Sequence, residues 1–153
     1  MPSRGNCLTN HKKVINFPSQ APPATWSFFD FGYSAESNPV EDWYQGQLSD
    51  RGRLTFDALL KDNQKIANPL NWQMSKKHMQ GILKGHQIWQ WTIRAEIPYR
   101  LLGIFGTGIK RAIFLIGYYH KGDSYTPSDA LQTALNRKKL YEKGACVLHE
   151  RSI

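Results

Sequence analysis

Residues 117–127, GYYHKGDSYTP, gather proton-transfer and cationic side chains in one short connector. His120 can serve as a general acid or base because imidazole titrates near neutral pH. Lys121 beside it can stabilise negative charge that develops during a reaction. The stretch is therefore a candidate site for proton transfer. The ordinary alternative is a pair of solvated strand-end residues.

Two tyrosines of this connector can contribute binding energy. Tyr119 and Tyr125 can stack on an unpaired nucleobase, a contact worth about 1 to 3 kcal/mol per base. For Tyr119 we favour a second interpretation, in which the ring packs in the core beneath the final helix. For Tyr125 both interpretations stay open.

Arginines near predicted strand ends are candidates for binding phosphate. Arg100 is the first candidate, because a guanidinium holds two phosphate oxygens in a fork and stays charged at any working pH. Its alternative is a surface ion pair with Glu96. Arg94 has the same two interpretations, phosphate binding or a surface position, and in the second it simply flanks the nucleic-acid groove. Arg137 and Lys138 can extend the phosphate-binding surface, although cations in a last turn also stabilise a helix without any ligand.

The elements that must position these residues begin with an aromatic strand at residues 26–32. Asn38 predicts the cap of a helix with Pro39 at its first position, and Ser49 or Asp50 predicts the cap of a second helix. Two amphipathic helices in series predict a helical hairpin.

From residue 88 the apolar pattern changes to period two. Trp89, Trp91 and Ile93 share one face of a strand, and segments 99–105 and 111–119 complete an antiparallel meander joined by a glycine-bearing turn. A final helix is expected to start with Thr126 as cap and Pro127 at its first position.

The element order predicts an α+β fold, in which an N-terminal strand and a helical hairpin pack on a small twisted antiparallel sheet, followed by a C-terminal helix. One sheet face is expected to remain open, with Arg94, Arg100 and His120 converging on it. We expect a flexible arm at residues 1–25, one domain at 26–144 and a tail at 145–153.

Charge and hydropathy restrict the partners and the compartment. Lys and Arg total 20 against 12 acidic residues, and the formal charge of +8 favours polyanionic partners such as nucleic acid. The longest apolar run, residues 112–119, is too short to cross a bilayer, and no signal-peptide pattern begins the chain. The expected location is the cytoplasm.

Two cysteines, Cys7 and Cys146, stand near opposite ends of the 153-residue chain. They form no C-x-x-C pair, and the five histidines are scattered along the sequence. We therefore expect free thiols, no metal site and no cofactor.

The segments WQWTIRAEIPYRLLGIF, FLIGYYHKGDSYTP and DALQTALNRKKLYE, in this order, resemble the RelE/HigB superfamily of type II toxins, in particular its phage-derived HigB-like branch. Family-like features fall at residues 88–94, Tyr99-Arg100, residues 117–121, Thr126-Pro127, and Ala134 with Arg137. The likeness extends over residues 26–144. It departs from the family where His120-Lys121 replaces a lysine pair, in the long N-terminal arm and in the C-terminal tail.

The resemblance implies a RelE-like fold and a ribosome-dependent mRNA endoribonuclease, or mRNA interferase, that inhibits translation. It implies metal-independent cleavage through attack of the ribose 2′-hydroxyl on the adjacent phosphate, with Arg94, Arg100, His120 and Lys121 as catalytic residues and Tyr119, Tyr125, Arg137 and Lys138 as substrate-binding residues. The implied partners are mRNA on the ribosome and an antitoxin of the helix-turn-helix type. Two alternatives remain, a non-catalytic module that binds nucleic acid or antitoxin and a gyrase-directed toxin on the same fold.

Overall fold

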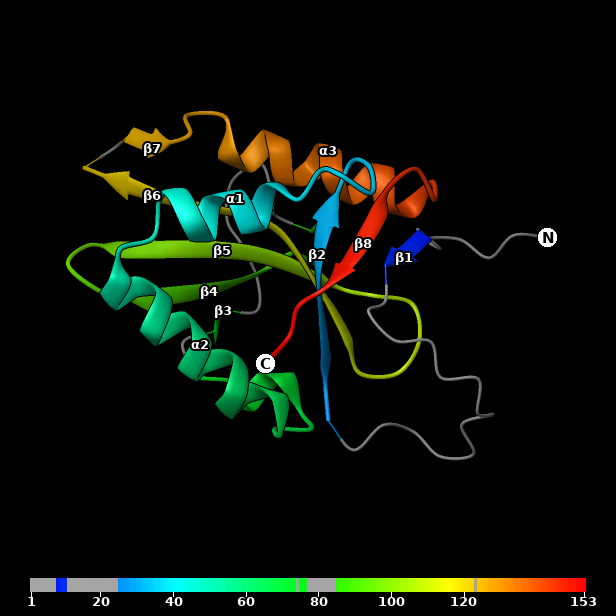
Figure 1. Ribbon diagram of the computed structural model, residues 1–153, viewed down its shortest axis with the longest axis horizontal. Coiled ribbons are helices and arrows are strands. Elements are labelled where there is room, and N and C mark those ends of the chain that lie inside the picture. The colour runs from blue at the N-terminus through cyan, green and yellow to red at the C-terminus, as the bar shows by residue number, and fades with distance from the viewer. Residues whose placement is uncertain (1–7, 11–24, 74, 77–84, 123) are drawn as a thin grey trace.

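The computed structural model describes residues 8–10, 25–73, 75–76, 85–122 and 124–153, with the backbone alone at 8–10, 75–76 and 120. Within these residues, strands and helices form an α+β arrangement, in which the first two α-helices follow one another and a run of strands precedes the third (Figure 1). The strands are β1 (Leu8–Asn10), β2 (Ser27–Gly32), β3 (Ser75–Lys76), β4 (Trp89–Arg94), β5 (Pro98–Phe105), β6 (Arg111–Lys121), β7 (Ser124–Thr126) and β8 (Val147–Glu150). The helices are α1 (Pro39–Gly46), α2 (Asp50–Gln64) and α3 (Ala130–Glu142), with a short 3-10 helix η1 (Pro69–Asn71).

Side-chain caps start the first two helices. The Asn38 side chain accepts a hydrogen bond from the backbone N–H of Glu41, and the Ser49 hydroxyl accepts one from Gly52, both at 3.0 Å. Each cap satisfies a backbone donor that has no partner inside the helix. Both predicted helix starts are confirmed, and Ser49 is the cap of α2.

One mixed sheet of eight strands runs through the described residues in the order β1-β8-β2-β6-β5-β4-β3, with β7 paired to β6. The predicted antiparallel meander β4-β5-β6 is confirmed. The expectation that the whole sheet is antiparallel is wrong, because β2 pairs parallel to β6 and β1 pairs parallel to β8. β2 reaches β6 only through the intervening helices and meander, a long connection that permits parallel pairing.

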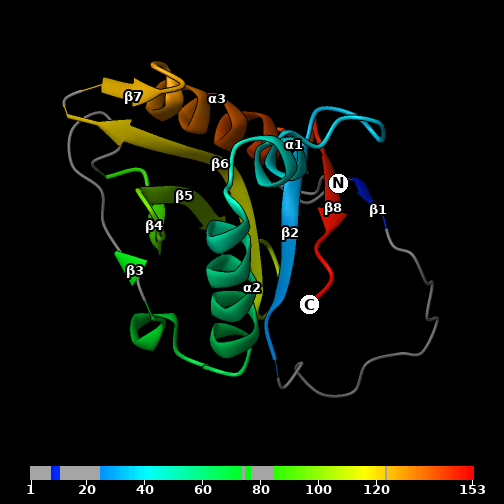
Figure 2. The ribbon, with the colours of Figure 1, turned by 60° about the vertical axis from the view of Figure 1, so that its left-hand side comes forward.

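Apolar side chains of both parities along β6 bury both faces of the sheet. Ala112 and Phe114 belong to a cluster under α1 and α2, whereas Ile113 and Leu115 belong to a second cluster with α3 residues (Figure 2). The expectation that one face stays open is therefore wrong over most of its area. A strand whose successive residues are all apolar is typical of a strand covered on both sides.

The two ends of the chain are not separate from the domain, as the predicted arm and tail would be. Residues 145–153 contain β8, which lies inside the sheet between β1 and β2, and residues 8–10 of the expected arm form β1. β8 has only four residues, too few for alternation to be recognised in the sequence. Neither residue 25 nor residue 144 therefore marks an end of the sheet.

Helix α3 begins later than its sequence signals predict. Thr126 pairs with Tyr119 in β7, so it cannot cap a helix, and α3 starts at Ala130 after Asp129. The helix ends at Glu142, shortly before Gly144, which adopts a φ of 70° typical of a helix stop. No helix among the described residues has the length and apolarity needed to span a bilayer.

Candidate functional site

Thr92, Arg100 and Tyr118 stand side by side across three strands of the sheet. Thr92 of β4 pairs with Arg100 of β5, and Arg100 pairs with Tyr118 of β6. Directly opposed residues of antiparallel strands project from the same face. Tyr118 belongs to the cluster on the α3 side, so this row lies on that face, near the end of the sheet where β6 turns into β7.

Hydrogen bonds join the row to Gln90. Arg100 Nη1 donates to Thr92 Oγ1 at 3.1 Å, and Gln90 Nε2 donates to the same oxygen at 3.4 Å. The Tyr118 hydroxyl donates to Gln90 Oε1 at 3.3 Å. Arg100 is half-buried, and the network fixes where its guanidinium lies. Glu96, the partner of Arg100 in the alternative interpretation, accepts a hydrogen bond from the Ser49 hydroxyl at 2.5 Å.

Tyr118 is held as a neutral phenol. Burial raises its pKa to about 12, the nearby Tyr125 adds to the shift and the Arg100 guanidinium opposes it. The rings of Tyr118 and Tyr125 meet edge to face with centroids 5.5 Å apart. Tyr118 is 2% exposed whereas Tyr125 is 37% exposed, so a substrate can reach Tyr125 but not Tyr118.

The other predicted catalytic residues do not all lie on the same face as this row. Arg94 is exposed at the end of β4, two positions after Thr92 and therefore on the same face. Lys121 is exposed in the turn into β7 but has the opposite parity from Tyr118. The His120 backbone pairs with Tyr125, while its side chain lies outside the part of the structure that is described.

Tyr119 packs on the other side of the sheet from the one predicted. It is half-buried against the cluster under α1 and α2, with its ring centroid 6.1 Å from that of Tyr99. Tyr118 takes the buried place on the α3 side. The apolar run around both tyrosines carries no sign of which parity faces which helix, so the sequence could not separate them.

Arg137 has a structural role that excludes it from a phosphate-binding surface. It is 9% exposed and donates from Nη1 to the carbonyl of Leu115 at 2.7 Å and from Nε to the Tyr33 hydroxyl at 3.0 Å. Its guanidinium also lies over the rings of Phe31 and Tyr33. The structure therefore does not present the predicted substrate-binding residue Arg137 as an exposed cation, because the helix turns this position toward the sheet.

Lys138 lies away from the Arg100 row. Its ammonium is 3.7 Å from a Glu142 carboxylate oxygen, an ion pair between successive turns of α3. It lines a pocket of about 280 Å³ together with Tyr141 and Phe105, at the opposite end of β5 from Arg100. The structure does not bring Lys138 to the predicted catalytic residues.

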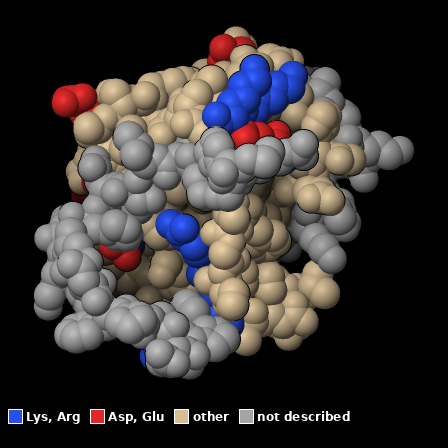
Figure 3. All heavy atoms as spheres, turned by 90° about the vertical axis from the view of Figure 1, so that its right-hand side faces the viewer, with Lys and Arg blue, Asp and Glu red and all other residues tan. Residues whose placement is uncertain are grey.

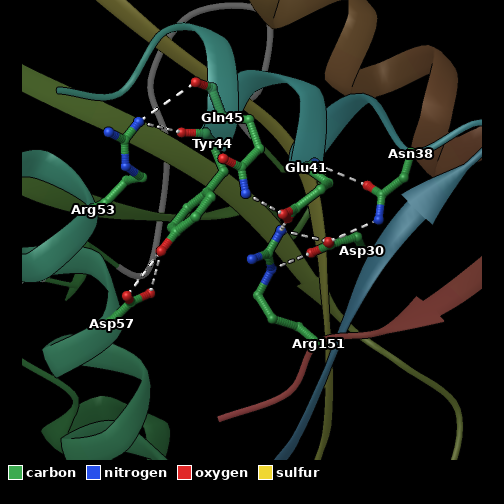
Figure 4. A network of polar contacts seen from close by, with 8 residues as sticks. All are labelled: Asp30, Asn38, Glu41, Tyr44, Gln45, Arg53, Asp57 and Arg151. Carbon is green, nitrogen blue, oxygen red and sulfur yellow. Dashed lines mark hydrogen bonds and ion pairs between the residues drawn. The ribbon is translucent and has the colours of Figure 1, made fainter. Parts of the chain in front are cut away.

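A second polar cluster lies on the α1 and α2 side, where Arg151 forks onto Asp30 (Figure 4). Arg151 donates to the two Asp30 oxygens at 2.9 and 2.6 Å and to a Glu41 oxygen at 2.9 Å. Asn38 donates to Asp30 as well, at 3.0 Å. Burial alone would lower the pKa of Arg151, but attraction by Asp30 and Glu41 raises it above its ordinary value.

This cluster borders the pocket formed by α1, α2 and the C-terminal residues, which has a volume of about 760 Å³. Tyr44 donates to both oxygens of Asp57, and burial followed by the Asp57 hydrogen bond raises its pKa to about 12. The central polar groups of the pocket thus bind one another. Their arrangement ties β2, α1 and the C-terminal segment together.

Cys146 corrects the expectation of free thiols, since it is 5% exposed and disulfide-bonded. Cys7 lies outside the described residues. Disulfides persist mainly in oxidising compartments, so this bond is an argument against the cytoplasmic expectation. Within the described residues, no group of three or more His, Cys, Asp or Glu side chains is placed to hold a metal ion.

Basic side chains do not form one continuous surface on the face drawn in Figure 3, where Lys and Arg gather in separate places and acidic groups adjoin the upper one. Comparison with protein-family models, curated proteins and solved structures finds no match for this chain. The site must be interpreted from its own residues.

Sequence reasoning missed Gln90, Thr92 and Tyr118, which hold Arg100 in place. A signal for the first two existed, because they alternate with Trp89 and Trp91 on β4 and therefore project from the face opposite the tryptophans. Polar residues on a strand face that is otherwise apolar indicate a hydrogen-bonded cluster. The ion pair of Asp30 and Arg151 had no such signal, since 121 positions separate the two residues.

Proposed function

We propose that this protein is the toxin of a type II toxin-antitoxin system, with a RelE-like fold, and that it cleaves mRNA on the ribosome. The observation that carries the proposal is the half-buried Arg100, which is held by Thr92 on a row of polar side chains beside the exposed Tyr125. A fixed guanidinium next to an accessible aromatic ring suits a phosphate flanked by an unstacked base.

The proposed reaction breaks one phosphodiester bond of the mRNA. The ribose 2′-hydroxyl loses its proton and attacks the adjacent phosphorus, and the bond to the 5′-oxygen breaks as that oxygen gains a proton. The products are a 2′,3′-cyclic phosphate and a 5′-hydroxyl. Arg100 would stabilise the charge that grows on the non-bridging oxygens, and Tyr125 would stack on a neighbouring base.

The remaining roles follow from the positions of the flanking residues and from the resemblance. Arg94, exposed on the Arg100 face, would contact a neighbouring phosphate. Proton transfer is assigned to His120, and Lys121 at the turn would bind the strand that leaves the site. A helix-turn-helix antitoxin would neutralise the toxin by covering these residues.

The test is primer extension on an mRNA translated in a purified system. Wild-type protein should create new 5′ ends within codons, and omitting ribosomes should abolish them. Arg100→Ala should lower the cleavage rate by about 10²- to 10³-fold, the usual effect of removing one donor to a transition-state oxyanion. Arg51→Ala is the matched control, because Arg51 is exposed on α2, which packs on the opposite sheet face.

Equal losses in Arg51→Ala and Arg100→Ala would contradict a specific site at Arg100. An intact mRNA with folded wild-type protein would contradict the interferase. It would favour a non-catalytic binding module or a gyrase-directed toxin, which a DNA supercoiling assay with gyrase separates.

A further inference from the structure

The Thr92 hydroxyl receives two hydrogen bonds, one from Gln90 on its own strand β4 and one from Arg100 on the neighbouring strand β5. Arg100 Nη1 donates to it at 3.1 Å and Gln90 Nε2 at 3.4 Å. A threonine hydroxyl has two lone pairs and one O–H group. Both lone pairs are therefore occupied, and the hydroxyl can act toward any further group only as a donor.

No acceptor for that donor is present among the described residues, since neither Gln90 nor Arg100 presents an acceptor to it. Gln90 directs its amide nitrogen to Thr92, because its carbonyl oxygen already accepts from the Tyr118 hydroxyl. The Tyr118 hydroxyl is the donor of this bond, and burial raises the Tyr118 pKa to about 12, so the phenol keeps its proton at neutral pH. The hydrogen bond from Tyr118 thereby orients the Gln90 amide, and the Gln90 amide in turn orients the Thr92 hydroxyl.

Accepting from a guanidinium also makes the hydroxyl a stronger donor, since successive hydrogen bonds polarise one another. Thr92 is half-buried, whereas Gln90 is 5% exposed, so the hydroxyl is the end of the chain that a ligand can reach. It lies beside the guanidinium of Arg100, where a phosphate oxygen is the acceptor of matching chemistry.

We propose that Thr92 is a substrate-binding residue whose hydroxyl donates to a non-bridging oxygen of the phosphate gripped by Arg100, and that Gln90 is the positioning residue that fixes its direction. This inference rests on the proposed function, because the phosphate is that of the mRNA to be cleaved. It adds a neutral donor to a site otherwise built from cations.

The test compares Thr92→Val, which keeps the shape of the side chain and removes the hydroxyl, with Thr92→Ser, which keeps the hydroxyl. Single-turnover cleavage of ribosome-bound mRNA gives the rate, and competition by an mRNA with 2′-deoxyribose at the cleaved position gives affinity without reaction. Thr92→Val should lower the rate by about 10²-fold, with a much smaller change in affinity, since the phosphate oxygens carry more charge in the transition state. Thr92→Ser should cleave within a few-fold of wild type.

The variant Gln90→Met tests the orientation of the Thr92 hydroxyl separately from its contact with the phosphate. It keeps Thr92 and removes the amide that occupies one lone pair, so the hydroxyl can rotate and cleavage should fall less than in Thr92→Val. Equal losses in Thr92→Ser and Thr92→Val would assign the effect to packing and overturn the inference. Wild-type rates in Thr92→Val would overturn it while leaving the interferase intact, whereas failure of the wild-type protein to cleave would overturn both.

Discussion

At the scale of single residues, the neutral state of Tyr118 is a consequence of where it lies. Its hydroxyl is buried under the α3 side of the sheet and donates to Gln90. A phenol with a pKa raised to about 12 cannot serve as a base near neutral pH. Tyr118 therefore acts through its hydrogen bond, which orders Gln90 and Thr92 next to Arg100.

This raised pKa has a measurable alkaline consequence. Between pH 10, the ordinary tyrosine pKa, and pH 12, the unfolded chain has released the Tyr118 proton while the folded chain retains it. The free energy of unfolding should therefore fall as pH rises through this window, whereas below pH 10 the titration of Tyr118 adds no pH dependence. Tyr118→Phe should weaken that fall.

Absorbance near 295 nm follows phenolate formation during an alkaline titration. The difference between wild type and Tyr118→Phe should have its midpoint near pH 12. Tyr44→Phe is a comparison on the opposite sheet face, where the Tyr44 pKa is also raised to about 12. A Tyr118 midpoint near 10 would contradict a buried phenol.

At the scale of elements, glycines let aromatic rings lie directly on the strands. A Cβ at Gly117 of β6 would meet the indole of Trp43 from α1, and one at Gly103 of β5 would meet the indole of Trp89. These contacts set how closely α1 and the neighbouring β4 side chains approach the sheet. Strand glycines at such positions are typical of close packing.

Gly117→Ala should lower the free energy of unfolding by about 1 to 3 kcal/mol, the usual cost of overpacking a core. Gly46→Ala is the control, because no atom lies within 4 Å of a Cβ built at Gly46 in α1, where alanine favours helix. Urea unfolding followed by circular dichroism compares the two. An unchanged urea midpoint in Gly117→Ala would contradict this prediction, since it would show that α1 can move away from the sheet without loss of stability.

At the scale of the whole molecule, the C-terminal segment closes the fold. β8 pairs with both β1 and β2, and Arg151 beyond it binds Asp30 of β2 and Glu41 of α1. The Arg151 and Asp30 side chains are 8% and 3% exposed. Removing one member of a buried ion pair leaves the other charge without compensation.

Arg151→Ala should therefore lower the free energy of unfolding by about 3 to 5 kcal/mol. The double variant Arg151→Met with Asp30→Asn removes both charges and should be more stable than Arg151→Ala. Lys139→Ala, at an exposed position of α3, should leave stability within about 0.5 kcal/mol of wild type. Denaturant midpoints measure all three, and a double variant no more stable than Arg151→Ala would contradict an electrostatic origin.

The sequence by itself determined those features whose physics is local. Caps at Asn38 and Ser49 and the alternation along β4 specify elements because each signal lies within a few residues of the contact it forms. The antiparallel meander could be predicted for the same reason, since a short turn joins β5 to β6. The α+β class also needed only residue types and order.

Tertiary structure alone decided which side chains meet. β2 pairs with β6 and β8, and Arg151 reaches Asp30, through contacts between residues far apart in the chain that no local pattern encodes. It also decided the parity that buries Tyr118 and places Tyr119 on the other face, and the turn of α3 that directs Arg137 to the Leu115 carbonyl. The physical reason is that burial and pairing depend on the whole sheet, whereas capping and periodicity depend on the neighbouring residues alone.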